Sequence, residues 1–251
     1  MKEYWNKYTL LFGKTIFHPQ FIIFAQNQDV YEEVRRRARN KTLIDIGCGN
    51  MPYRRDLEPV IKKYVGLEHP SFGLSYHPGE KPEILADISE GIPVGDNKFE
   101  IALFLEVLEY IENPIKVLKE INRILKRKGI LIITCAFLYP IMKTPPDRNR
   151  FTDIQIRSML RESGFKVLKV KELGGFTATI LVFINIFLMK KIFDILKGKK
   201  GIISYLSLIF LASVTLPIVI FSNTIYILSR MIKIKSNNYF PIDYLVVASK
   251  L

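Results

Sequence analysis

Alternating short apolar segments and amphipathic helices predict an α/β protein built on a doubly wound parallel sheet. Three observations favour this fold class: strands and helices alternate from residue 42 onward, a glycine-containing turn follows the first predicted strand, and 49% of the 251 residues are hydrophobic. Such a chain can bury a full core, which excludes a wholly disordered protein and a disulfide-stapled miniprotein. We expect one large domain, or one domain with an appendage.

The predicted strands are short apolar runs. They cover residues 42–46, 64–68, 83–86, 100–105, 130–134 and 165–171, and residues 243–249 are typical of one more buried strand. The helices between them act as crossover connections, which make neighbouring strands parallel.

The predicted helices carry capping signals. Residues 113–127 form an amphipathic pattern that begins with the Asn113–Pro114 pair, and Gly129 is expected to close that helix. A second helix, 152–162, ends before Ser163 and Gly164. The segment 71–82 contains two prolines and is too broken for a regular helix.

The domain organisation follows from composition. Residues 1–41 are a helical lead-in, 42–173 the sheet domain, 174–235 an apolar helical insertion, and 236–251 return a final strand to the sheet.

Charge and cysteine content narrow the partners. The net charge of +13 indicates contact with something anionic: nucleic acid, a phospholipid surface or a phosphorylated substrate. Many basic residues crowd beside the apolar insertion, which favours an anionic membrane surface over a nucleic acid. Cys48 and Cys135 form no CxxC pair and only three histidines are present, so we expect a reduced, cytosolic compartment and no metal site.

The first chemical signal is the turn with Asp45, Gly47 and Gly49 after the first strand. Glycines there let a ligand approach the backbone, and open α/β sheets bind ligands at the carboxyl ends of their strands. Pro52 stands where the dinucleotide fingerprint needs a third glycine, which weakens a nicotinamide or flavin assignment. The charge of Asp45 suits a ligand that carries an ammonium or sulfonium group.

Acidic residues follow at successive strand ends. Glu68 ends the second strand, Asp87 the third, and Glu106 follows the fourth. A carboxylate in the second position can accept hydrogen bonds from both ribose hydroxyls, and one in the third position suits an exocyclic adenine amine.

These segments, with residues 91–100, 108–110 and 120–129, resemble the successive motifs of class I S-adenosylmethionine-dependent methyltransferases that act on small molecules (the type 11-like family). The resemblance implies a Rossmann-like seven-stranded sheet with an antiparallel last strand, and S-adenosyl-L-methionine as cofactor. It places the turn against the methionine moiety, Glu68 on the ribose and Asp87 with Ile88 around the adenine. The chain departs from the family at Met51, usually glycine, and at Tyr110, often histidine. The implied cofactor-binding residues are Asp45, Gly47, Cys48, Gly49, Glu68, Asp87, Ile88 and Glu106.

The substrate side rests on the segment 147–152. It resembles a His-Asp-Tyr-x-Arg-Tyr-Thr segment of methyltransferases in polysaccharide and lipid-linked glycan pathways, with Pro146 in place of the histidine. The resemblance makes Asp147 the candidate base and Arg150 the candidate partner of an anionic acceptor group. Alternatively, Asp147 caps a turn and Arg150 pairs with it.

Two functions remain from the sequence. The first is methyl transfer at the inner membrane face, to an oxygen of a glycan or lipid-linked intermediate. The second is a catalytically weak or inactive methyltransferase-fold protein that serves as a membrane-attached binding or scaffold protein.

The membrane topology follows from chain order. If residues 244–249 rejoin the sheet, the two ends of the insertion lie on the same side of a bilayer, which excludes a single crossing. Pro217 is expected to break or kink the apolar stretch 201–229. We therefore expect a monotopic or re-entrant arrangement on the cytoplasmic side; the alternative is that these helices pack on the domain or form a dimer interface.

Overall fold

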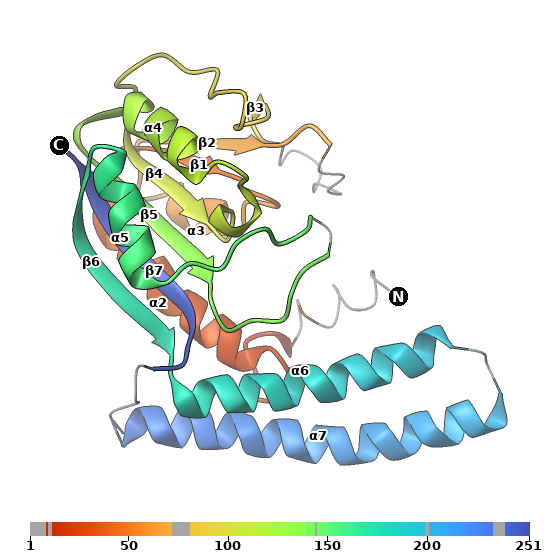
Figure 1. Cartoon of the computed structure of the whole chain (residues 1–251). Helices are drawn as coiled ribbons and strands as arrows, with labels where there is room; N and C mark the ends of the chain where they lie inside the picture. Colours follow the sequence, from red (N-terminus) through yellow and green to blue (C-terminus); the bar gives the residue numbers. More distant parts are fainter. Residues whose placement is uncertain (1–8, 10–11, 72–80, 144, 199–200, 233–238) are drawn as a thin grey trace. The chain divides into compact units, whose positions relative to one another are not determined.

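The computed structural model describes every residue except 1–8, 10–11, 72–80, 144, 199–200 and 233–238, and the side chain at 203 (Figure 1). The chain forms two compact units. The sheet unit comprises Val30–Leu173 and Asp243–Leu251, and the helical unit comprises Met1–Asp29 and Gly174–Ile242.

A seven-stranded sheet is the framework of the sheet unit, in the order β3-β2-β1-β4-β5-β7-β6. The pairs from β3 through β5 are parallel, whereas β7 pairs antiparallel with β5, from Ile130 opposite Ser249 to Ala136 opposite Asp243. This arrangement confirms the predicted doubly wound sheet and its antiparallel last strand. The strands are β1 (Thr42–Ile46), β2 (Lys63–Glu68), β3 (Ile84–Leu85), β4 (Phe99–Leu105), β5 (Leu125–Ala136), β6 (Phe165–Gly174) and β7 (Pro241–Lys250).

Both faces of the central strands are buried. In β1, Leu43 belongs to the apolar cluster on one face and Ile44 to the cluster on the other, because successive side chains of a strand point to opposite sides. Burial on both sides explains why these strands read as continuous apolar runs. Helices accompany the sheet: α2 (Phe21–Ala38), which continues from the helical unit, α3 (Arg54–Leu57), the 3-10 turn η1 (Leu108–Tyr110), α4 (Pro114–Ile124) and α5 (Asp153–Glu162).

Helix α4 begins as predicted and ends earlier. Asn113 Oδ1 accepts the backbone N–H of Lys116 at 3.1 Å, and Pro114 occupies the first turn. The helix stops at Ile124 rather than near residue 127, because the N–H of Lys98 donates to the Ile124 carbonyl at 2.8 Å and the next residue joins β5. The prediction that Gly129 closes this helix was therefore wrong; Gly129 lies inside β5.

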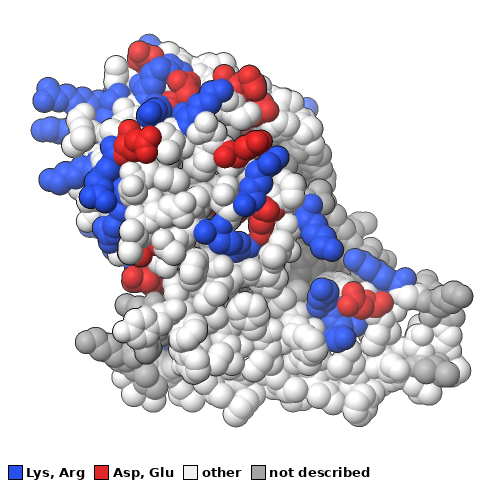
Figure 2. All heavy atoms as spheres, in the orientation of Figure 1, with Lys and Arg blue, Asp and Glu red and all other residues white. Residues whose placement is uncertain are grey.

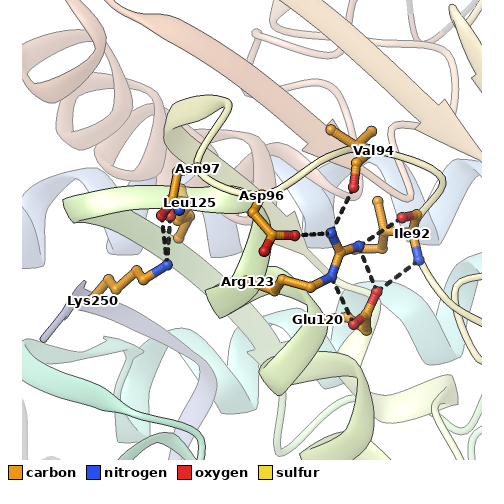
Figure 3. A network of polar contacts seen from close by, with 8 residues as sticks. All are labelled: Ile92, Val94, Asp96, Asn97, Glu120, Arg123, Leu125 and Lys250. Atoms are coloured by element: carbon orange, nitrogen blue, oxygen red, sulfur yellow. Dashed lines mark hydrogen bonds and ion pairs between the residues drawn. The ribbon is translucent and has the colours of Figure 1, made fainter.

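Arg123 ties α4 to the segment that precedes β4 (Figure 3). Its guanidinium donates to the carboxylates of Glu120 and Asp96 and to the carbonyls of Ile92 and Val94, at 2.7–3.0 Å. These bonds fix the connection that leaves β3. The prediction that 71–82 forms no regular helix falls mostly on 72–80, outside the described residues.

The helical unit contains α6 (Phe176–Lys197) and α7 (Ile202–Met231), which pack side by side as an antiparallel pair (Figure 1). The expected break at Pro217 does not occur, and α7 runs through it as one helix. Proline removes one helical hydrogen bond, but its φ is close to the helical value, and packing against α6 supports the rest of the helix.

Two buried asparagines join this pair to the lead-in. Asn223 Nδ2 donates to the carbonyls of Ile16 and His18, at 2.8 and 3.0 Å. Asn185 Nδ2 donates to the Asn223 side-chain oxygen at 3.2 Å and to the Pro19 carbonyl at 3.3 Å. The segment 16–19 is thereby held on α6 and α7.

Much of the α6–α7 surface is apolar. Within the described residues, Ser204–Met231 is a helix long and apolar enough to cross a bilayer, with a mean hydropathy of 2.1. Only 11% of its most apolar window is buried, so this apolarity is not explained by a role as a core helix. On the face drawn in Figure 2, the helical pair is largely uncharged apart from one group of basic and acidic side chains.

Candidate functional site

A cavity of about 600 Å³ opens at the carboxyl ends of β1, β2, β3 and β4. Parallel strands bring these ends to one edge of the sheet, which is the usual ligand position in open α/β folds. Six of the eight predicted cofactor-binding residues line it: Gly47, Gly49, Glu68, Asp87, Ile88 and Glu106.

In the glycine turn, the backbone conformation and packing at position 47 require a glycine. Its φ is +71°, and a Cβ there would lie 2.4 Å from a methyl group of Val107. Met51, at the position where the family usually has a third glycine, also has a positive φ, +50°. Its side chain is buried in the core, where its sulfur lies close to Gly66. The turn thus keeps the shape that glycine usually provides.

Glu68 is 6% exposed and holds the turn against the end of β2. Its Oε2 accepts the N–H of Gly49 and its Oε1 accepts the N–H of His69, both at 2.7 Å. Each carboxylate oxygen has a second lone pair, so Glu68 can also accept hydroxyl donors from a ligand in the cavity.

Asp87 lies at the end of the cavity beside β3. Its Oδ1 accepts the N–H and the hydroxyl of Ser89, at 2.9 and 2.7 Å, and these bonds lower the pKa of the carboxyl. The other oxygen lies 3.5 Å from His69 Nε2. His69, which was not predicted from the sequence, also lines the cavity.

Asp45 and Cys48, predicted to touch the ligand, do not line the cavity. Asp45 is 3% exposed and accepts a hydrogen bond from the Tyr64 hydroxyl; burial raises the pKa of its carboxyl to about 7. Cys48 packs in the core close to Gly66. Both side chains are buried in the sheet unit, where they pack beneath the backbone of the glycine turn and do not reach the ligand cavity.

Glu106 and Glu109 bring two acids to the end of β4. Glu106 lines the cavity with a φ of +54°, unusual for a residue with a side chain, and its N–H donates to the Thr134 carbonyl at 3.0 Å. Glu109 is 2% exposed and its Oε2 has no hydrogen-bond partner. Burial is the main cause that raises the pKa of Glu109 to about 8, and the negative charge of Glu106 adds to it. Glu109 was not predicted as a site residue, although its place between Leu108 and Tyr110 in an apolar segment indicated burial.

Asp147 and Arg150 do not line the cavity, and they form an ion pair with each other. Asp147 also accepts the N–H of Met142 at 3.0 Å, and its side chain is 5% exposed. The structure therefore has the arrangement left as the alternative, a pair that holds the turn 142–150. The neighbours Pro146 and Arg148 do reach the cavity wall.

No group of three or more His, Cys, Asp or Glu side chains in the described part of the chain is arranged to hold a metal ion.

The comparisons agree with this geometry. Residues 44–133 match the model of a methyltransferase domain family. An uncharacterised protein of Methanocaldococcus jannaschii is 26% identical over 164 residues, which cover 59% of this chain and 78% of that protein. A probable S-adenosylmethionine-dependent methyltransferase of Mycolicibacterium smegmatis is 22% identical over 155 residues, 57% of this chain and 59% of that protein.

Solved structures show the same fold. An S-adenosylmethionine-dependent methyltransferase from Mesorhizobium loti superposes with a TM-score of 0.55 at 14% identity, covering 91% of this chain and all of that one. The [4+2]-cyclase SpnF gives a TM-score of 0.58 at 18% identity, covering 90% and 80%.

Proposed function

Because this chain carries a class I S-adenosylmethionine-dependent methyltransferase domain, we propose that the 600 Å³ cavity binds the cofactor in an extended form along the strand ends. Adenine, ribose and sulfonium follow one another in the molecule, just as β3, β2, β1 and β4 follow one another in the sheet. Adenine then lies beside Asp87 and Ile88, the ribose on Glu68, and the sulfonium between Gly47 and Glu106. The succession of these residues along one edge is the observation that carries the proposal.

Methyl transfer is an in-line displacement: the S–CH3 bond breaks as the bond to the acceptor forms, and the positive charge of the sulfonium is lost. Alignment and exclusion of water contribute more than acid–base chemistry. A hydroxyl acceptor must still release its proton. We propose that the proton passes to the Glu106 carboxylate, which lines the cavity, rather than to Asp147, which is occupied by Arg150. Asp147 and Arg150 then position the acceptor wall at Pro146 and Arg148.

The proposed acceptor is an oxygen of a glycan or lipid-linked intermediate at the inner face of the membrane. Support comes from the segment 147–152 and from the exposed apolar side chains of α6 and α7, among them Phe187, Leu206 and Phe210. Side chains of this kind on a helical pair with lysines at its ends suit the interface of an anionic bilayer. The proposed arrangement is monotopic or re-entrant, so that both ends of the helical pair stay on the cytoplasmic side.

Calorimetry with S-adenosylmethionine and S-adenosylhomocysteine tests the cofactor assignment. Glu106→Gln is expected to weaken binding of the sulfonium form more than that of the neutral thioether, because only the former has a positive charge beside β4. Asp87→Asn is the matched control, since a contact to adenine affects both ligands equally. If Glu106→Gln loses the same affinity for both ligands, the sulfonium does not lie beside Glu106.

Transfer of a radiolabelled methyl group to membrane lipid extracts and to glycan fractions tests the reaction. Label in an oxygen-linked product supports the proposal. Strong cofactor binding without label in any fraction would favour the binding or scaffold role. Pelleting with vesicles of 30% anionic phospholipid, compared with neutral vesicles, tests membrane attachment separately.

A further inference from the structure

The helical unit contains an apolar groove of about 330 Å³ that is separate from the cofactor cavity. Its walls come from the lead-in, from α6 and from α7. The lining residues are Phe17, Pro19, Met189, Ile192, Phe193, Ala212, Thr215, Leu216 and Val219. The volume is at the lower end of the range for small-molecule sites, about 300–1,000 Å³.

Thr215 is the polar side chain among these lining residues. The residue is 5% exposed, and its hydroxyl oxygen is buried without a hydrogen-bond partner. A buried hydroxyl without a partner is unfavourable, so such groups usually mark a missing ligand or water. A ligand with an apolar body and one oxygen acceptor would satisfy both the groove and this hydroxyl.

Lysines flank the groove along α6. At 100° per residue, Lys190 and Lys197 lie on one side of this helix, next to the edge of the face that carries Met189 and Phe193. Both lysines are exposed, and Asp194 lies between them in the sequence. Two cations along the border of an apolar groove suit an anionic headgroup.

We propose that this groove binds one acyl chain of an anionic glycerophospholipid. The chain lies between α6 and α7, its ester carbonyl accepts a hydrogen bond from Thr215, and its phosphate contacts Lys190 and Lys197. Two of its lining residues on α7, Ala212 and Leu216, are exposed, and the rest of this helix is apolar and little buried, which favours a lipid over a polar partner. This inference rests on the proposed membrane attachment but not on the identity of the methyl acceptor.

Three lipids with one hydrocarbon chain each separate the Thr215 contact from the lysine contacts. The full chain in detergent is titrated with three lipids: 1-palmitoyl lysophosphatidate, 1-palmitoyl lysophosphatidylcholine, and hexadecyl phosphate, which has no ester carbonyl. Binding is read by displacement of a fluorescent fatty acid. Thr215→Val, nearly isosteric, is expected to weaken lysophosphatidate about three- to tenfold and to leave hexadecyl phosphate unchanged. Lys190→Gln with Lys197→Gln removes the preference for lysophosphatidate over lysophosphatidylcholine.

Ala212→Phe fills the groove and is expected to abolish binding of all three probes. Ser213→Phe adds the same ring at the next, exposed position outside the lining, and it should bind normally. Calorimetry with S-adenosylhomocysteine checks that the sheet unit is intact in each variant, and it also separates failure of this inference from failure of the cofactor assignment. The inference is wrong if both phenylalanine variants lose binding equally, or if Thr215→Val weakens lysophosphatidate and the carbonyl-free hexadecyl phosphate alike. It is also wrong if Ala212→Phe separates a dimer while lipid binding persists.

Discussion

Glu68→Gln is expected to weaken the cofactor site and the glycine turn together. The carboxylate accepts two backbone N–H groups, from Gly49 and His69, each at 2.7 Å. Glutamine keeps one acceptor oxygen and places an NH2 group against the other N–H donor. A hydrogen bond to a charged group contributes about 1.5–3 kcal/mol, so we expect the unliganded protein to lose about that much free energy of unfolding.

The Glu68→Gln variant is also expected to bind the cofactor more weakly, an effect separate from its lower free energy of unfolding. If the ribose hydroxyls donate to Glu68, the amide keeps one weaker acceptor in place of two charged ones. The loss of about 1.5–3 kcal/mol corresponds to a roughly ten- to hundredfold weaker Kd for S-adenosylhomocysteine, measured by calorimetry. Urea unfolding of the unliganded protein gives the stability change separately.

Glu83→Gln is the matched control. Its Oε2 accepts the N–H of Gly66 at 2.7 Å, and Glu83 is not among the residues that line the cavity. This variant should lose stability without losing cofactor affinity. The reasoning fails if Glu68→Gln binds S-adenosylhomocysteine as tightly as the unchanged protein, or if Glu83→Gln loses as much affinity.

Three further predictions concern stability. The folded-state pKa of Asp45, about 7, lies above the ordinary value of 3.8 for this side chain, so folding binds a proton and stability falls as pH rises from about 4 to 7. Asp45→Asn should flatten this dependence in thermal melts, and an unchanged slope would assign it to other groups. Asn113→Ala removes the cap of α4 and should cost about 1 kcal/mol in urea unfolding, whereas Asn113→Asp should retain most of it. Lysine cannot replace the five hydrogen bonds that the Arg123 guanidinium donates (Figure 3), so Arg123→Lys is expected to lose at least about 2 kcal/mol. A loss below about 0.5 kcal/mol would show that this network is dispensable.

The sequence was sufficient for the parallel α/β sheet and for the acids at its strand ends, because apolar runs alternate with crossover helices. The antiparallel last strand was implied only by the family resemblance. It was less informative about side-chain direction. Asp45 was expected to face a ligand, yet the alternation along β1 places it on the same side as Leu43, in the interior. Local pattern alone also could not exclude a break at Pro217, since tertiary packing decides whether a helix continues through a proline.

The antiparallel strand β7 lies between β5 and β6, although the whole helical pair separates it from β6 in the sequence. During synthesis, the stretch 175–240 must therefore leave the ribosome before the strand that completes the sheet, a delay of several seconds at about 5–20 residues per second. Until then, the apolar edge of β5 has no partner and the nascent chain exposes it to chaperones and to aggregation. The pairing of β5 with β7 also spans more than one hundred residues of sequence, so its formation should be a slow step in folding.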